Sequence, residues 1–419
     1  MKLELLTVGN ELLLGFTVDT NSAEIARSLA AIGVAIVRRT SVGDDRDAIQ
    51  DAVGAALDRT GTVIVTGGLG PTRDDITKHA VAALLDLPLE FHEEIWQGLV
   101  ERFRGLGREP VRSNRSQAEV PRGGTVLRNR WGTAPGLWLD SPRGVVIMLP
   151  GVPIEMRNLL AHEVLPRLAP RAGKQVIRSR TVRTTAIPES TLAERLGEVE
   201  VALRPLGLAY LPGLEGVDLR LTSWGAGAAE ADARLDAGTA ELRRRAGAHV
   251  YGEGEETLAE IVVSLLRSHG RTVGVAESCT GGLLGGRLTD VAGSSDVFRG
   301  GIIAYDNGVK VGALDVPAEL LRQHGAVSDP VAAAMAEGVR RRLDVDIGIG
   351  ITGIAGPGGG SDEKPVGTVC LAVAGLGDVF TRRTIFPGSR PEVRARAVQM
   401  ALFMLRQRLI GSASATGSA

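Results

Sequence analysis

The chain has 419 residues, more than one hydrophobic core usually supports, so two or three domains are expected. Its formal charge of -1 gives no general attraction for nucleic acid, and an aromatic content of 3% leaves few rings for stacking bases. No apolar stretch reaches the roughly 18 residues of a membrane span, and no signal peptide is recognised after Met1. With only two cysteines, the composition predicts a cytoplasmic protein that binds neither membranes nor nucleic acid.

The first predicted domain covers residues 1–170, where short β-branched runs alternate with helical patterns. The expected strands are Leu3–Val8, Val34–Val42, Val63–Thr66 and Val145–Leu149, and the expected helices are Ser22–Ala31, Ala48–Leu57 and Pro153–His162. This alternation predicts a wound α/β layer.

A small α+β, KH-like module is predicted over residues 175–250. Its expected elements are the strands Thr181–Ala186, Leu208–Leu211 and Val217–Ser223 and the helices Glu189–Val201 and Ala228–Arg245. A Gly-x-x-Gly string, Gly213–Gly216, joins two of the strands, but it holds Leu and Glu where a loop that clamps RNA would hold basic residues. RNA binding is therefore not favoured.

A second wound α/β domain is predicted over residues 252–410. Its expected elements are the helices Leu258–Ser268, Asp329–Leu343 and Pro391–Leu409 and the strands Thr272–Ala276, Gly301–Tyr305, Asp346–Ile351 and Gly367–Ala374. Residues 411–419 are all Gly, Ser, Ala or Thr and are predicted to be a disordered tail. The fold class is therefore α/β, with two wound domains joined by the small α+β module.

Three of the expected strands run into a Thr-Gly loop, at Thr66, Thr280 and Thr352. Free backbone N–H groups in such loops suit anionic ligands, above all where a helix follows. A single Gly pair more often marks only a tight turn. Three such loops in one chain favour phosphate-bearing ligands in both wound domains.

The first candidate site is Glu277–Gly282, at a corner between an expected strand and a helix. Ser278 offers a hydroxyl and Cys279 a thiol where the helix N-terminus can donate N–H groups to a developing oxyanion. The alternative is that Ser278 or Thr280 only caps the helix.

The segment Tyr305–Lys310 brings a phenol and a lysine to the end of the next expected strand. Lysine is rare in this chain, since five of the 48 basic residues are Lys. No histidine forms an obvious base for Ser278, whereas a buried lysine with a lowered pKa can take the seryl proton, with Tyr305 relaying it or orienting the pair. The Gly-dense segment Gly350–Gly360 would wrap a ligand, to which Thr352 could donate.

Ala276–Gly282, Tyr305–Lys310 and Gly353–Gly360 closely resemble three motifs of the amidase domain in the CinA family, the competence/damage-inducible proteins. The resemblance implies hydrolysis of nicotinamide mononucleotide to nicotinic acid mononucleotide and ammonia, a reaction of the pyridine nucleotide cycle. It implies no cofactor for this domain.

The same resemblance implies roles for individual residues of this site. Ser278, rather than the competing thiol of Cys279, would form the acyl-enzyme, and Tyr305 and Lys310 would be the base pair. Thr352 would contribute to the oxyanion or substrate site. The implied substrate-binding residues are Glu277, Thr280, Gly281, Gly282, Asn307, Gly353, Gly356 and Gly358.

A second candidate site combines glycine turns with carboxylates in Val8–Gly15, Val18–Asn21 and Thr66–Lys78. Oxygen ligands beside a phosphate loop suggest a divalent cation such as Mg²⁺ or Mn²⁺. The competing interpretation is that Asp74 and Asp75 merely cap the helix that follows them.

These segments, together with Leu149–Met156, resemble the molybdopterin-binding, MoaB/MogA-like domain of CinA proteins over about Met1–Pro170. The resemblance implies an ADP-ribose pyrophosphatase that depends on Mg²⁺, Mn²⁺ or Co²⁺. The implied metal ligands or bases are Glu11, Asp44, Asp74, Asp75 and Glu155, and the implied substrate-binding residues are Gly67, Gly68, Gly70 and Lys78. Asn10 stands where the family usually has Thr, which puts substrate positioning in doubt.

Two other functions compete with this pair of hydrolases. One is a regulatory or binding protein in competence or the DNA-damage response, with a recombinase as its partner, and the other is a molybdenum-cofactor enzyme, which rests on fold analogy alone. Paired α/β modules are consistent with a homodimer.

Overall fold

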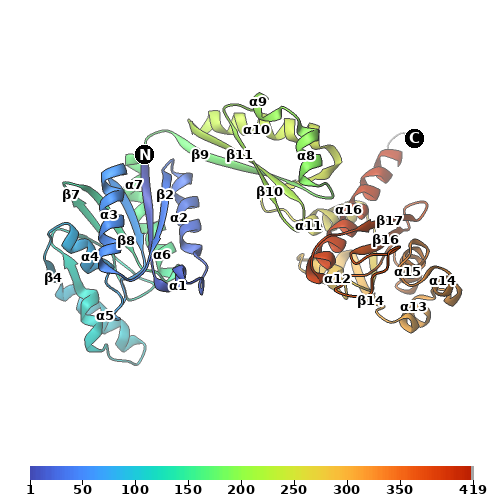
Figure 1. Ribbon diagram of the computed structural model, residues 1–419, viewed down its shortest axis with the longest axis horizontal. Coiled ribbons are helices and arrows are strands. Elements are labelled where there is room, and N and C mark those ends of the chain that lie inside the picture. The colour runs from blue at the N-terminus through green and yellow to red at the C-terminus, as the bar shows by residue number, and fades with distance from the viewer. Residues whose placement is uncertain (417–419) are drawn as a thin grey trace. The chain divides into compact units, whose positions relative to one another are not determined.

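A computed structural model describes residues 1–416, which divide into two compact units (Figure 1). One unit contains residues 1–178 with 223–234, and the other contains the rest of the described chain. Within residues 1–416, none of the helices combines the length and the apolar character that crossing a membrane requires.

The N-terminal domain is built on a six-stranded sheet with the order β2-β1-β3-β8-β7-β6. Its strands are β1 Lys2–Val8, β2 Ala35–Val42, β3 Thr62–Thr66, β6 Thr125–Leu127, β7 Gly136–Ser141 and β8 Gly144–Leu149, beside a separate pair, β4 Leu89–Phe91 and β5 Glu119–Pro121. Its helices are α1 Asn10–Leu13, α2 Thr20–Ala31, α3 Arg46–Thr60, α4 Thr77–Leu84, α5 Glu93–Gly105, α6 Pro153–Leu159 and α7 Leu165–Ala172. The first four strands are parallel, while β6 and β7 are antiparallel additions at one edge that the sequence analysis did not predict.

Both faces of this sheet are covered, as Figure 1 shows with α3 and α4 on one side and α2 and α6 on the other. Along β1, Leu6 and Val8 pack toward α3 and α4, whereas Leu3 and Leu5 pack toward α2, α6 and α7. Neighbouring residues of a strand point to opposite faces, so one apolar run supplies two cores.

The middle module is a four-stranded sheet with the order β10-β11-β9-β12. Its elements are β9 Val176–Thr184, α8 Glu189–Leu196, α9 Val199–Ala202, β10 Gly207–Pro212, β11 Val217–Ala226, α10 Ala228–Ala246 and β12 Val250–Glu253. The single helix predicted over Glu189–Val201 is wrong, because Gly197, with a φ of 56°, ends α8 and separates it from α9.

The C-terminal domain contains a five-stranded sheet with the order β14-β13-β15-β16-β17. Its strands are β13 Val273–Glu277, β14 Phe298–Ile303, β15 Ile347–Gly353, β16 Thr368–Ala374 and β17 Phe380–Ile385, and its helices are α11 Leu258–Ser268, α12 Leu283–Thr289, α13 Asn307–Leu314, α14 Ala318–His324, α15 Asp329–Arg342 and α16 Arg390–Thr416. The disordered tail predicted over 411–419 is therefore wrong for 411–416, which continue α16, and residues 417–419 lie outside the described chain.

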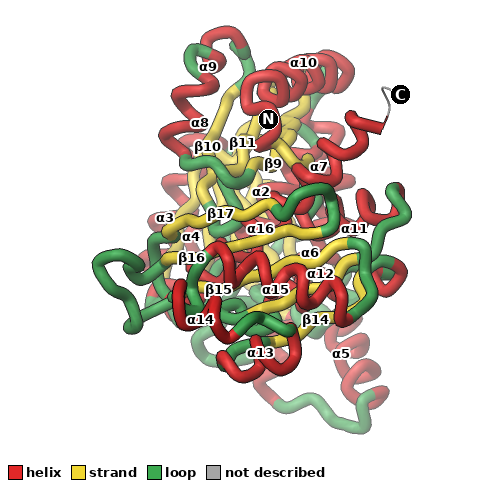
Figure 2. The backbone as a smooth tube through the Cα atoms, turned by 90° about the vertical axis from the view of Figure 1, so that its right-hand side faces the viewer, coloured by secondary structure: helices red, strands yellow, loops and turns green. Residues whose placement is uncertain are grey.

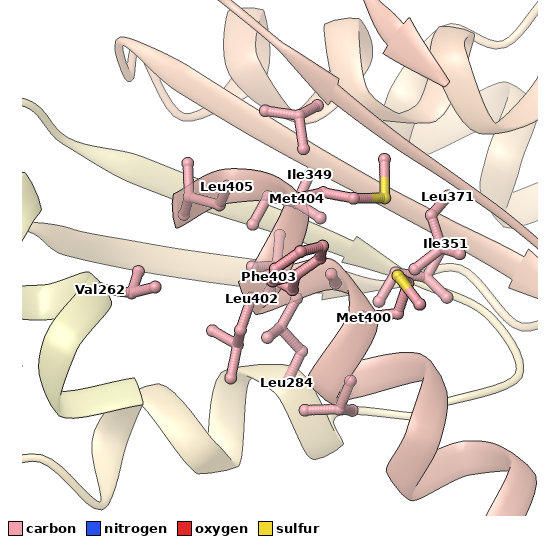
Figure 3. Packing of buried hydrophobic residues seen from close by; sticks show 14 of the residues in the cluster. Val262, Leu284, Ile349, Ile351, Leu371, Met400, Leu402, Phe403, Met404 and Leu405 are labelled. Atoms are coloured by element: carbon pink, nitrogen blue, oxygen red, sulfur yellow. The ribbon is translucent and has the colours of Figure 1, made fainter. Parts of the chain in front are cut away.

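The two faces of β15 pack differently because its sequence alternates Ile with Gly. Ile349 and Ile351 join the large apolar core with α16 residues such as Phe403 (Figure 3). Gly348 and Gly350 face α15, which lies on the opposite side with α13 and α14 (Figure 2). A Cβ atom at Gly350 would lie 2.2 Å from the carbonyl oxygen of Ala332, so the helix approaches the strand only because no side chain is there.

Gly350→Ala should lower the free energy of unfolding by about 2 kcal/mol, because the added methyl group has to push backbone away from backbone. Urea unfolding followed by circular dichroism measures this change. The matched control is Gly286→Ala, whose Cβ meets nothing within 4 Å and which should change stability by less than about 1 kcal/mol. Equal unfolding midpoints for both variants would show that the packing of α15 does not depend on the glycines of β15.

Candidate functional site

The candidate nucleophile lies in a tight turn between β13 and α12. Gly281 and Gly282 make this turn with φ angles of 58° and 94°, a region that other residues adopt only with strain. Ser278, 7% exposed, begins the turn, and its N–H donates to the carbonyl of Ile351 in the adjacent strand β15 at 2.9 Å. The predicted strand-to-helix corner is thus present.

The buried carboxylate of Glu277 holds this turn. It accepts hydrogen bonds from the N–H groups of Gly282 at 3.0 Å, Leu284 at 3.1 Å and Gly285 at 2.8 Å. The prediction that the start of this helix would donate to an oxyanion is therefore wrong for these three groups, because the protein's own carboxylate already occupies them. Glu277, predicted to bind substrate, is instead fully engaged with backbone.

Thr280 is a polar residue of this turn whose hydrogen-bond donors are unused. It is completely buried, and its hydroxyl has no hydrogen-bond partner within residues 1–416. In the same described range its N–H also has no acceptor. Buried polar groups are usually paired, so this residue is suited to a ligand or a developing negative charge.

Lys310 is among the largest fully buried side chains of the described residues, and it lies within electrostatic reach of Cys279 in the same turn. Its amine donates to the carbonyl oxygens of Ala304 at 2.9 Å and Tyr305 at 3.2 Å. Burial lowers the pKa of Lys310, while Asp306 and Cys279 act in the opposite direction. An amine that loses one proton can keep both carbonyl bonds with its two remaining N–H groups, which leaves its lone pair free to act as a base.

Tyr305 does not relay a proton in this arrangement. Its side chain is 62% exposed, and its hydroxyl accepts a hydrogen bond from Arg390 at 2.9 Å. Among the described residues, neither the Tyr305 hydroxyl nor the Lys310 amine forms a hydrogen bond with the hydroxyl of Ser278. The structure therefore gives Lys310 and Tyr305 separate positions, not those of a hydrogen-bonded pair.

Two arginines at the start of α16 belong to this site and were missed by the sequence analysis. Arg390 also donates to the carbonyl of Gly356 at 2.8 Å, and Arg394 donates to the carbonyl of Thr280 at 2.8 Å. The Nε of Arg394 is buried without a partner in the described chain. A signal was present, because the helix dipole disfavours cations at a helix N-terminus and two arginines stand there four residues apart.

Of the remaining predicted residues, Thr352 is already engaged in a side-chain hydrogen bond, whereas within residues 1–416 Asn307 and Gly358 are not. Thr352 is buried and its hydroxyl already donates to the carbonyl of Ala326 at 2.8 Å, so the predicted donor to a substrate is in use. Gly353 ends β15, while Asn307 is exposed at the start of α13 and Gly358 has open space around it. These last two residues remain available to a ligand.

Cys279 is a poor competitor for Ser278. It is buried, and this burial raises the pKa of its thiol to about 12. A thiol attacks as its thiolate, so almost none of the reactive form would exist at neutral pH.

The N-terminal candidate residues line a cleft of about 420 Å³ at the ends of β1 and β3. The predicted residues in its wall are Glu11, Asp44, Asp74, Asp75, Glu155, Gly67, Gly68 and Gly70. Its wall also contains Asp19 and Asn21, which belong to the predicted segment Val18–Asn21, together with Gln117 and Thr133. One end of the sheet thus gathers almost the whole predicted set.

Two carboxylates of this cleft each accept a hydrogen bond from a different backbone N–H group. Asp44 accepts the N–H of Asn10 at 3.0 Å, and Asp75 accepts the N–H of Thr72 at 2.8 Å. Burial raises the pKa of Glu155, whereas hydrogen bonds lower that of Asp74. Within residues 1–416 no three acidic, His or Cys side chains form a group able to hold a metal ion. As placed, the predicted ligand set does not fit a resident metal.

Lys78 lies outside the wall of this cleft. Its amine donates to the carbonyl of Ser116, and burial lowers its pKa to about 8 against the opposing charges of Glu119 and Asp75. The prediction that Lys78 would neutralise a bound phosphate is not supported by this position.

Comparisons with known families match the chain in three segments. Residues 4–170 match a probable molybdopterin binding domain, residues 179–252 match the damage-inducible protein CinA KH domain, and residues 255–409 match the CinA C-terminal domain. A CinA-like protein from Gemmatimonas aurantiaca is 54% identical over 411 residues, which are 97% of this chain and 96% of that protein. This chain belongs to the CinA family.

A second full-length relative agrees with this assignment. A CinA-like protein from Parasynechococcus marenigrum is 47% identical over 97% of this CinA chain and 98% of its own length. Among solved structures, the competence/damage inducible protein CihA from Agrobacterium tumefaciens is 43% identical, covers 36% of this chain and 93% of its own, and has a TM-score of 0.35. The predicted family and the predicted multidomain α/β fold are confirmed.

Replacing Glu277 tests whether its carboxylate holds the nucleophile turn. Glu277→Gln should cost about 2 kcal/mol, because a buried group that accepts three N–H bonds is replaced by an amide that cannot accept all of them. Hydrogen exchange of the peptides that cover β13 and α12 measures the local loss.

The matched control is Glu392→Gln, which removes a more exposed carboxylate that accepts the N–H of Ser389 at 2.7 Å. Its effect should stay near or below about 1 kcal/mol and should not reach β13. Unchanged exchange in Glu277→Gln would contradict the role given to this carboxylate.

Proposed function

We propose that the C-terminal domain hydrolyses the carboxamide of nicotinamide mononucleotide to give nicotinic acid mononucleotide and ammonia. The observation that carries this proposal is the buried amine of Lys310, which has two carbonyl acceptors and a lowered pKa next to the Ser278 turn. Seryl hydroxyls need a nearby base to become nucleophilic, and a lysine that is easily deprotonated can supply one.

The proposed reaction has two stages. The Ser278 oxygen attacks the carboxamide carbon as its proton passes to the Lys310 amine, and the C–N bond then breaks as that proton leaves with ammonia. Water next attacks the acyl-enzyme, and its proton returns through Lys310 to the Ser278 oxygen. Negative charge on the carbonyl oxygen would be stabilised by the unused donors of Thr280.

Arg390 and Arg394 support a substrate with a phosphate group. Both guanidinium groups reach loops of this site, where they bind the carbonyls of Gly356 and Thr280. Guanidinium groups combine fixed charge with several donors, which suits a phosphate monoester. The exposed ring of Tyr305 offers a flat surface for the pyridine.

Ser278→Ala should lower the rate of ammonia release from nicotinamide mononucleotide by about 10⁴-fold or more, as removal of a catalytic serine does in other hydrolases. Cys279→Ala is the matched control and should keep most of the rate.

Because the neutral amine is the base, the rate of the unchanged enzyme should rise with pH toward the pKa of Lys310, which lies below its usual 10.5, and Lys310→Met should abolish this rise.

Three results would contradict the amidase proposal. The first is a Ser278→Ala variant that stays fully active. The second is an equal loss of rate in Ser278→Ala and Cys279→Ala, and the third is an unchanged chain that releases no ammonia. The last result would favour the alternative of a regulatory protein in competence or the DNA-damage response.

We further propose that the N-terminal cleft hydrolyses ADP-ribose at its diphosphate. The convergence of Glu11, Asp44, Asp75 and Glu155 around a glycine-rich loop favours this second activity. The described wall of the cleft contains no Lys, Arg or His, so a diphosphate would meet uncompensated negative charge unless a divalent cation entered with it.

Hydrolysis of ADP-ribose should therefore require added Mg²⁺ or Mn²⁺ and should stop with a chelator. Asp75→Asn should lower the rate at least about tenfold, because the cation that enters with the diphosphate would lose one of the carboxylates that attract it. Asp58→Asn is the control, since Asp58 pairs with Arg143 outside the cleft. Full activity in the presence of a chelator would contradict this proposal.

A further inference from the structure

We propose that the cavity between the Gly213–Gly216 loop and helix α16 binds a small organic anion with a flat apolar body. This cavity has a volume of about 440 Å³ and is lined by the middle module on one side and by β17 and α16 on the other. A second cavity of about 290 Å³ adjoins the same loop, and both share Leu214, Glu215 and Gln399. Volumes of this size are typical of small-molecule sites.

The Gly213–Gly216 loop forms a fixed wall of this cavity. The carboxylate of Glu215 pairs with Arg183 at 3.3 Å and with Arg287 at 3.1 Å. Its carbonyl accepts the hydroxyl of Thr185 at 2.7 Å. The charge of Glu215 is thus compensated by arginines, and the loop is held against the domain that follows it instead of being free to grip a nucleic-acid backbone.

The unsatisfied polar groups of the cavity are hydrogen-bond donors. Gln399 is 8% exposed, and its Nε2 has no acceptor within residues 1–416. Arg382 lines the same cavity, and its guanidinium group forms no hydrogen bond or ion pair within the described chain. Arg396 adds a second guanidinium group, of which one nitrogen donates to the carbonyl of Pro387. Glu189 is the one lining carboxylate besides the paired Glu215.

These groups favour an anion over a neutral or cationic ligand. A buried amide donor without an acceptor is costly, and a ligand oxygen that accepts from Gln399 would remove that cost. Two guanidinium groups against one uncompensated carboxylate leave the lining positive. The remaining walls include Ile187, Ile385, Phe386 and Met400, which are suited to a planar apolar body.

The probe for this site is 4-fluorobenzoate, observed by fluorine NMR with the full-length chain. Binding should broaden the signal with a dissociation constant below about 1 mM. The neutral isostere 4-fluorobenzamide should bind at least tenfold more weakly, because the lining recognises charge. Absence of binding by 4-fluorobenzoate, or equal binding of the two probes, would overturn the proposal.

Two substitutions locate the probe. Arg382→Gln and Gln399→Leu should each weaken 4-fluorobenzoate at least tenfold, and Arg382 is exposed, so its replacement should not disturb folding. Arg390→Gln is the matched control, since it removes an arginine of the candidate amidase site that does not line the cavity. An equal loss in Arg390→Gln, or unchanged binding in both cavity variants, would place the anion elsewhere. Because the readout is binding, failure of this test leaves the ammonia assay unaffected.

Discussion

The buried carboxylate of Glu277 is the constraint on which the C-terminal site depends. A charge away from water is tolerated only with strong partners, and here three backbone N–H groups at the start of α12 supply them. The carboxylate joins the end of β13 to the helix across the turn that contains Ser278 and Thr280. It also consumes the N–H groups that a helix start would otherwise offer to a ligand, whereas the hydroxyl of Thr280 in the same turn has no partner within residues 1–416.

The other half of this site comes from the end of the chain. The apolar face of α16 packs into the main core, where Leu402 and Phe403 lie among residues of the sheet and of α12 (Figure 3). That packing fixes the helix, and its first turns then bring Arg390 and Arg394 to the carbonyls of two loops. Core burial and the placement of positive charge are therefore two consequences of one helix, so a change that loosens the core would also move the arginines.

The two wound domains place loops at the ends of parallel strands but give those loops opposite charge. In the N-terminal domain the cleft is lined by carboxylates without a basic residue in its described wall. In the C-terminal domain Arg394 contacts the nucleophile turn, Arg390 contacts Tyr305, and the buried Lys310 lies within electrostatic reach of Cys279. A shared architecture thus leaves the chemistry to the loop side chains, as is general for α/β folds.

The sequence by itself determined the wound domains, the middle module and the strand-end positions of Ser278 and the cleft carboxylates, because these follow from local hydrophobic periodicity and glycine turns. Lys310, predicted to follow directly on a strand, lies instead inside helix α13. The sequence also favoured a buried Lys310. Only the tertiary structure decided which polar atoms meet. Tyr305 binds Arg390 from 85 residues away and Thr280 binds Arg394 from 114 residues away, while Lys78 turns to a nearby carbonyl instead of the cleft. Such pairings depend on how helices pack onto sheets, and no periodicity within a single segment contains that information.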